Sequence, residues 1–222
     1  MKYLYPITII DNFLDDPDTI VNWAKNLEYN YHPYHVYPGK RTNNLMEINK
    51  DFCYEVTQKV LKIFYENPSQ NYEARMYFDI IEREKYEEGW VHQDDGNISF
   101  LIYLNKTYKT NSGTSIYKKS PSIPFLPSNN SLLQIKSEDY KKKIISKEGR
   151  EARNKWNSSY EKILQINPLY NRIAIYPSSQ PHSADVLDIG IDEDRFILVG
   201  IIKHLNVSNS PLERINSFAH SL

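Results

Sequence analysis

The 222-residue chain has few of the residues that build several common kinds of site. It contains one cysteine, Cys53, so a disulfide within the chain cannot form and a cysteine-based zinc site is not expected. Only seven glycines are present, and neither a GxGxxG nor a Walker pattern occurs, which argues against a nucleotide-binding fold. Internal repeats are also lacking.

The sequence also lacks an excess of positive or negative charge, and it has no long apolar run. The 27 basic and 28 acidic residues leave a net charge of −1, so charge gives no reason to expect a nucleic acid or a membrane surface as partner. No apolar stretch approaches the ~18 residues of a membrane span, and the N-terminus does not have the pattern of a signal peptide. We therefore expect a cytoplasmic protein with one sizeable core, since 40% of the residues are hydrophobic.

The order of the predicted elements indicates the fold class. Residues 3–10 are predicted as a strand, and two amphipathic helices follow, one beginning near Pro17 and one over residues 51–66. A loop is expected over residues 31–45. From Tyr72 onward short strands are predicted at 73–83, 90–104, 113–118, 172–176, 182–186 and 195–203.

Such a run of short strands after two helices is typical of a β-sandwich or jelly roll with helices packed outside it. Residues 119–136 are rich in Pro and Ser and are expected to be irregular, whereas residues 137–165 are polar and helical in pattern. An excursion of this length is typical of a lid or a substrate-binding element. We expect a mainly β, α+β chain of one domain, with an N-terminal part (1–70), a jelly-roll core (72–118 and 171–205) and an insertion (119–170).

A candidate metal site is indicated by His92-Gln93-Asp94. On a strand, residues i and i+2 point to the same side, so His92 and Asp94 can present a nitrogen and an oxygen to one ion, while Asp95 points away. With His182 they would form the two-histidine, one-carboxylate facial triad of non-haem iron(II) oxygenases, which leaves three coordination positions open. A His-x-Asp pair also arises by chance, and the alternative is a surface histidine beside the turn that follows Asp94.

The surrounding sequence resembles the iron(II)- and 2-oxoglutarate-dependent dioxygenases of the prolyl-hydroxylase-like branch. That family has an H-x-D, a strand ending in YLN, a GG-x-x-x-F/Y element, a strand ending in F/Y-P, a distal histidine and then a basic residue. The likeness covers roughly residues 72–205, and Ser112-Gly113 stands in place of the double glycine. The order here is His92, Asp94, Tyr103-Leu104-Asn105, Gly113–Tyr117, Tyr176-Pro177, His182 and Arg195.

The resemblance implies a double-stranded β-helix, cupin-like fold and an oxygenase activity. Iron(II) would be held by His92, Asp94 and His182. The co-substrate 2-oxoglutarate would bind through its distal carboxylate to Arg195 and Tyr103. The implied reaction with O2 is hydroxylation of an amino acid, a peptidyl side chain or a small metabolite, with release of succinate and CO2.

Several alternatives stay open from the sequence. Arg195 suits a carboxylate because a guanidinium binds it bidentately, but it could instead pair with Asp192 or Asp194, and Tyr103 could be a core residue. The rival functions are a non-catalytic jelly-roll binding protein and a cupin-type metal enzyme that does not use 2-oxoglutarate. The substrate and the oligomeric state cannot be predicted. Packing roles are expected for Trp90, Trp156, Tyr117, His32 and His35, rather than contacts with a substrate.

Overall fold

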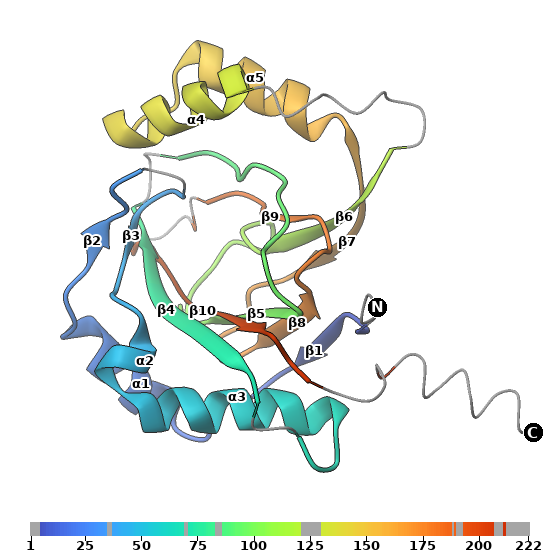
Figure 1. Cartoon of the computed structure of the whole chain (residues 1–222). Helices are drawn as coiled ribbons and strands as arrows, with labels where there is room; N and C mark the ends of the chain where they lie inside the picture. Colours follow the sequence, from blue (N-terminus) through green and yellow to red (C-terminus); the bar gives the residue numbers. More distant parts are fainter. Residues whose placement is uncertain are drawn as a thin grey trace, which may run out of the picture.

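Antiparallel sheets form the centre of the molecule (Figure 1). The structure, a computed structural model, describes residues 5–34, 37–68, 71–82, 86–120, 130–187, 189, 193–206 and 211. A seven-stranded sheet has the order β1-β8-β5-β10-β4-β3-β2, and a three-stranded sheet has the order β7-β6-β9. The strands are β1 Thr8–Ile10, β2 Asn30–Tyr31, β3 Lys40–Arg41, β4 Glu73–Ile81, β5 Ile98–Tyr103, β6 Thr114–Lys119, β7 Tyr160–Ile166, β8 Ile173–Pro177, β9 His182–Ala184 and β10 Arg195–Lys203.

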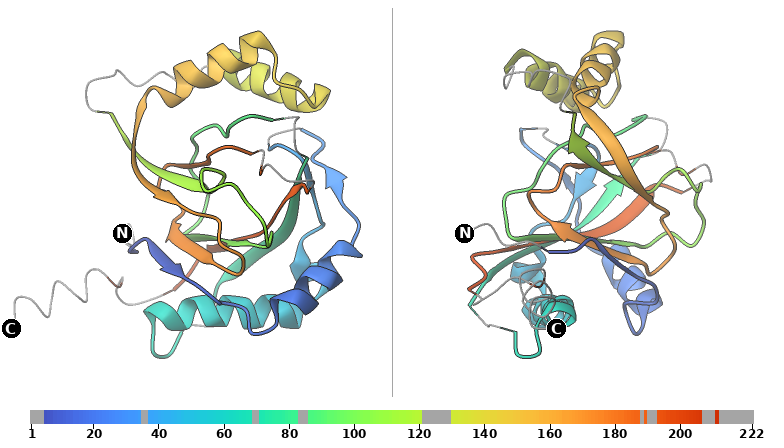
Figure 2. Two further views of the ribbon diagram at one scale, coloured as in Figure 1. Left: turned by 180° about the vertical axis from the view of Figure 1, so that it is seen from behind. Right: turned by 90° about the vertical axis from the view of Figure 1, so that its right-hand side faces the viewer.

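The helices lie at two ends of the molecule (Figures 1 and 2). Asp16 and Asn49 cap α1 and α3, each accepting a hydrogen bond from a backbone N–H of the first turn. Helix α3 packs against the outer face of the seven-stranded sheet, whereas α4 and α5 lie on the opposite side. No helix of the described residues is long and apolar enough to cross a membrane. The helices are α1 Pro17–Lys25, α2 Leu45–Ile48, α3 Lys50–Phe64, α4 Asn130–Lys142 and α5 Lys147–Asn157.

Side-chain alternation along the central strands separates the core from a pocket. In β10, Phe196, Leu198 and Ile202 belong to the hydrophobic cluster that contains the buried face of α3. Ile197 and Val199 belong to the other face and line the pocket. This period of two is what a strand imposes. Each fully buried aliphatic side chain stabilises the folded state by ~1.5–3 kcal/mol. The face of the sheet that packs against α3 therefore stabilises the fold, and the opposite face is free to form a site.

The predicted fold class is confirmed as mainly antiparallel β with flanking helices. The predicted bounds of β10 are correct, and α3 and β4 are found within two residues of their predicted ranges. The N-terminal strand is shorter than predicted, since β1 begins at Thr8. The predicted loop over residues 31–45 contains β3 and the end of β2, which pair with each other beside β4.

Three other local predictions were wrong. Residues 160–165 were predicted to be helical but form β7, because pairing with β6 satisfies the backbone groups of both strands, a gain that local periodicity does not record. Residues 130–136 were predicted to be irregular but begin α4, while 121–129 lie outside the described residues. Residues 90–97 are not a regular strand, and His92 makes only an isolated bridge there.

Candidate metal centre

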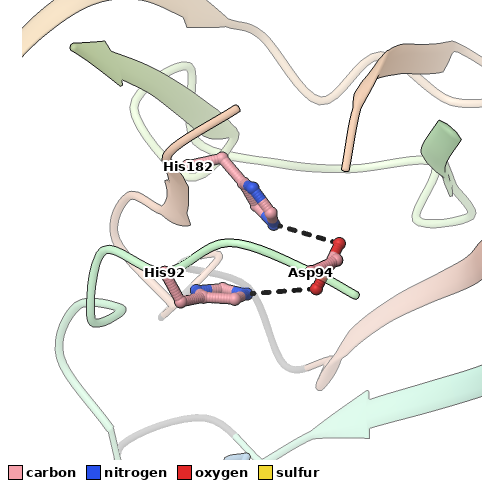
Figure 3. A group of neighbouring side chains, drawn as sticks. All are labelled: His92, Asp94 and His182. Carbon is pink, nitrogen blue, oxygen red and sulfur yellow. Dashed lines mark ion pairs between the residues drawn. The ribbon is translucent and has the colours of Figure 1, made fainter. Parts of the chain in front are cut away.

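His92, Asp94 and His182 come together where β9 pairs with the segment that precedes β5 (Figure 3). One ligand atom of each residue lies within 4.8 Å of the others. The His182 Nε2 is 3.5 Å from Asp94 Oδ2, and the His92 Nε2 is 3.9 Å from Asp94 Oδ1. These gaps are too wide for hydrogen bonds, but two ligand atoms that each lie about 2.1 Å from one ion can span them.

The backbone holds the two histidines opposite each other. The His92 N–H donates to the His182 carbonyl and the His182 N–H donates to the His92 carbonyl, both at 2.9 Å. The N–H of Asp94 donates to the Ser178 carbonyl at 2.8 Å. The shared direction of His92 and Asp94, predicted for a regular strand, therefore comes from an extended segment that is pinned at two points.

Hydrogen bonds to the far side of each ring orient the ligand atoms. The Nδ1 of His92 lies 2.8 Å from the Trp90 carbonyl, and the Nδ1 of His182 lies 2.9 Å from the Gln180 carbonyl. A carbonyl can only accept, so each Nδ1 carries a proton, and the nitrogen left to bind a metal is the Nε2 that faces Asp94. This arrangement of backbone carbonyls behind imidazoles is typical of metal-binding histidines.

The carboxylate is also held from behind. Ser99, on β5, donates to Asp94 Oδ2 at 2.7 Å, and the Ser99 and Ser178 hydroxyls are 2.9 Å apart. Ser99 and Ser178 are both buried. One carboxylate oxygen is thereby fixed, and the group is aligned with the two imidazoles.

Electrostatics keep the His92 ring neutral. Desolvation and the nearby His182 together lower its pKa to about 3, against the smaller opposing effect of Asp94. The side chain is still 49% exposed, but the ring lines a pocket whose walls limit its hydration. A neutral imidazole is the form that binds a cation.

The three side chains lie in the wall of a pocket of about 330 Å³. Arg195 and Thr114 also line this pocket, and the Arg195 guanidinium lies 5.7 Å from the ring of Tyr103. Arg195 is buried and donates to the carbonyls of Ser112 and Gly113, the second at 3.3 Å. Its alternative partner Asp192 lies outside the described residues, and no described carboxylate forms an ion pair with Arg195.

Three buried polar atoms near this end of the pocket make no hydrogen bond of good geometry in the described part of the chain, although the Thr114 hydroxyl lies close enough to the Tyr103 phenol to lower its pKa. They are the Arg195 Nε, the Tyr103 hydroxyl and the Thr114 Oγ1. Burial raises the pKa of Tyr103 to about 12, so its phenol stays protonated. Buried polar atoms are normally satisfied, so three together indicate a place where a polar ligand completes the structure.

Much of the remaining pocket wall could not be predicted from the sequence. Trp90 lines the pocket, whereas Trp156 instead donates from its indole to the backbone carbonyl of Val91 at 2.7 Å, and Tyr117 is not part of the lining. His32 accepts from the Tyr34 N–H, and His35 lies outside the described residues. The pocket residues that the sequence analysis did not identify include Tyr37, Arg41, Asp79, Thr114, Lys136 and Tyr140.

Residues 2–193 match a family of unknown function, DUF6445. The chain belongs to this family. The match contains His92, Asp94 and His182 and ends before Arg195. No curated protein matches this DUF6445 chain.

Solved structures are similar to the DUF6445 chain in fold. HygX from Streptomyces hygroscopicus, with nickel, 2-oxoglutarate and hygromycin B bound, is 7% identical, with 87% of this chain and 81% of HygX covered and a TM-score of 0.55. The non-heme alpha ketoglutarate dependent epimerase SnoN from nogalamycin biosynthesis is 8% identical, with coverages of 88% and 76% and a TM-score of 0.53. A Pseudomonas putida prolyl-4-hydroxylase is 13% identical, with coverages of 90% and 93% and a TM-score of 0.49. The predicted resemblance is confirmed as one of fold.

Proposed function

We propose that this DUF6445 chain is an iron(II)- and 2-oxoglutarate-dependent oxygenase that hydroxylates an amino acid, a peptidyl side chain or a small metabolite. The observation that supports this most directly is the convergence of two imidazole nitrogens and one carboxylate on a common point. This donor set, His92, Asp94 and His182, suits a non-haem iron(II) site. The fold is also that of HygX and SnoN, whose structures contain nickel or Fe3+ together with 2-oxoglutarate.

The unsatisfied atoms beside the triad fit 2-oxoglutarate. A carboxylate can accept from the Arg195 Nε, the Tyr103 hydroxyl and the Thr114 hydroxyl, which make no hydrogen bond of good geometry with the described residues. We propose that Arg195 and Tyr103 hold the distal carboxylate, with Thr114 as a third donor. Arg195 keeps its charge when buried, and its fork can still bind bidentately while other N–H groups contact backbone carbonyls.

When bound, iron(II) and 2-oxoglutarate supply the oxidising chemistry, in which O2 is reduced, 2-oxoglutarate becomes succinate and CO2, and the substrate is oxidised. The chain's residues do the rest. His92, Asp94 and His182 would hold the metal, and Ser99 fixes the carboxylate of Asp94. Tyr140 and Lys136 of α4 line the pocket, and we propose that the insertion limits access of water to it.

The same proposal covers the architecture. We propose that the chain is one dioxygenase domain over residues 1–222, with the two sheets forming a double-stranded β-helix. Residues 1–70 would support that core from outside, and residues 119–170 would form the lid. The placement of α4 beside the pocket supports this assignment of the lid.

The experiment is the anaerobic addition of iron(II) and 2-oxoglutarate to the purified chain. We expect a weak visible absorption band that requires both, and its loss in His92→Ala. The matched control is His204→Ala, because His204 is 79% exposed and lies outside the pocket. A wild-type protein that binds iron but shows no 2-oxoglutarate-dependent band would refute the proposal and favour a cupin-type enzyme or a non-catalytic binding protein.

A screen for succinate release then identifies the substrate. Free amino acids, peptides and small metabolites are each incubated with the iron-loaded protein, 2-oxoglutarate and O2. We expect succinate to rise above the substrate-free rate for the compound that is oxidised. Mass spectrometry of that compound distinguishes hydroxylation, a gain of one oxygen, from another oxidation.

A further inference from the structure

Lys136, on α4, brings a positive charge into the pocket that holds the candidate metal site. Its ammonium lies 5.9 Å from the ring centre of Trp90 and 5.7 Å from that of Tyr140. Both rings line the same pocket. An ammonium near an aromatic ring is attracted to its face, but the two rings supply no negative charge.

No carboxylate among the described residues compensates this charge. Burial lowers the pKa of Lys136 to about 8, and no acidic neighbour acts against that effect. The contrast is Arg41 in the same wall, which donates twice to Asp79, both at 2.6 Å. The Arg41 charge is thus neutralised by Asp79, whereas Lys136 has no such partner among the described residues.

We propose that Lys136 binds a carboxylate of the primary substrate, and that this substrate is a small carboxylic acid such as a free amino acid. The inference rests on the proposed function, which assigns Arg195 to 2-oxoglutarate and leaves the cation on α4 for the second ligand. A desolvated ammonium gains most from an anionic partner, because Coulomb attraction is stronger away from water. Lys136 is therefore a specificity-determining residue.

The size and chemistry of the pocket favour a small monoanion. About 330 Å³ lies at the lower end of the range for small-molecule sites, and the space must hold 2-oxoglutarate as well. A single ammonium balances a single negative charge. A phosphate ester carries up to two charges and is typically held by several donors, whereas the neighbours of Lys136 in the pocket are aromatic rings.

The test compares matched acids and amides by calorimetry. Each free amino acid, its carboxamide and, as a separate arm, glycerol phosphate are titrated into the full chain loaded anaerobically with iron(II) and 2-oxoglutarate. We expect at least one amino acid to bind at least tenfold more tightly than its carboxamide. In Lys136→Met this ratio should fall below threefold, in Lys136→Arg it should be largely kept, and the affinity for 2-oxoglutarate should change less than twofold.

Lys142→Met is the control on the same helix. Lys142 is exposed, so this substitution should leave all these affinities unchanged. Circular dichroism establishes that each variant is folded, and Lys136→Gln replaces Lys136→Met if the latter is not. The proposal is overturned if acids and amides bind equally, if no amino acid binds, if glycerol phosphate binds more tightly, or if Lys136→Met weakens 2-oxoglutarate instead. Failure of the proposed function appears separately, as a missing iron(II)–2-oxoglutarate band in the wild type, and the acid–amide ratio can then be measured on the metal-free chain.

Discussion

Replacing Arg195 with methionine should separate the stability of the chain from its ability to bind 2-oxoglutarate. The side chain is buried and its Nε has no partner among the described residues. Methionine removes a buried cation, which is favourable, but also removes two hydrogen bonds to the Ser112 and Gly113 carbonyls, worth ~1.5–3 kcal/mol each. These effects oppose each other, so we expect a folded variant.

For 2-oxoglutarate binding, in contrast, no favourable effect of Arg195→Met offsets the loss of the contact. Loss of a bidentate, charge-assisted contact removes ~3 kcal/mol or more, which is about a 100-fold rise in Kd. At a 2-oxoglutarate concentration 100 times the wild-type Kd, the ligand stabilises the wild type by ~2.7 kcal/mol but Arg195→Met by only ~0.4 kcal/mol. For a chain of this length each kcal/mol shifts Tm by ~2–4 °C, so the expected shifts are roughly 5–11 °C and ~1–2 °C.

The assay is differential scanning calorimetry under nitrogen with iron(II), with and without 2-oxoglutarate. The matched control is Arg75→Met on β4, because the Arg75 side chain is 47% exposed and pairs with Glu73 outside the pocket. Its shift with 2-oxoglutarate should equal that of the wild type. If Arg195→Met kept the full wild-type shift, the co-substrate would bind elsewhere and the role given to the unsatisfied Nε would be wrong.

Two further predictions concern groups that support the site. Ser99→Ala removes the 2.7 Å hydrogen bond to Asp94, so metal affinity should fall ~10–100-fold in a competition titration while the fold is kept; an unchanged affinity would contradict the orienting role. Arg41→Met leaves the buried carboxylate of Asp79 unpaired, so urea denaturation should show a loss of ~3–5 kcal/mol, and the double variant with Asp79→Leu should recover most of it. A double variant as unstable as the single one would show that the pair is not energetically coupled.

The parts of the fold that could be predicted are those in which local pattern and tertiary role agree. The range Arg195–Lys203 reads as an apolar strand and forms the centre of the larger sheet, where both neighbours are strands. Strand β7 could not be predicted because its exposed, polar surface resembles that of a helix, and only pairing with β6 determines its conformation. The first turns of α4 were not predicted, because the Pro- and Ser-rich residues before them gave no clear start to the helical periodicity.

The candidate site divides in the same way. His92, Asp94, His182 and Arg195 could be named because residue type, order and spacing carry the chemistry, and the structure places all four around one pocket. Lys136 could not be named, because its proposed role depends on the pocket around it and on the lack of an acidic partner among the described residues, not on a motif. The Arg41–Asp79 pair was also hidden, since it joins residues on β3 and β4 that only the sheet brings together. The two histidines were predicted to converge, but the bridge that aligns them was not.

That bridge has a consequence for how the chain can diverge. The reciprocal backbone hydrogen bonds of His92 and His182 close a loop of about 90 positions, at an entropic cost of ~4 kcal/mol that rises only with the logarithm of loop length. Folding meets that cost, so a cation arriving at the site does not. If the chain binds a metal as proposed, its affinity should therefore depend little on the length of the segment between the two histidines. Residues 119–170 lie between these two histidines, so under the proposed function we expect changes in the length or sequence of that segment to have little effect on metal affinity.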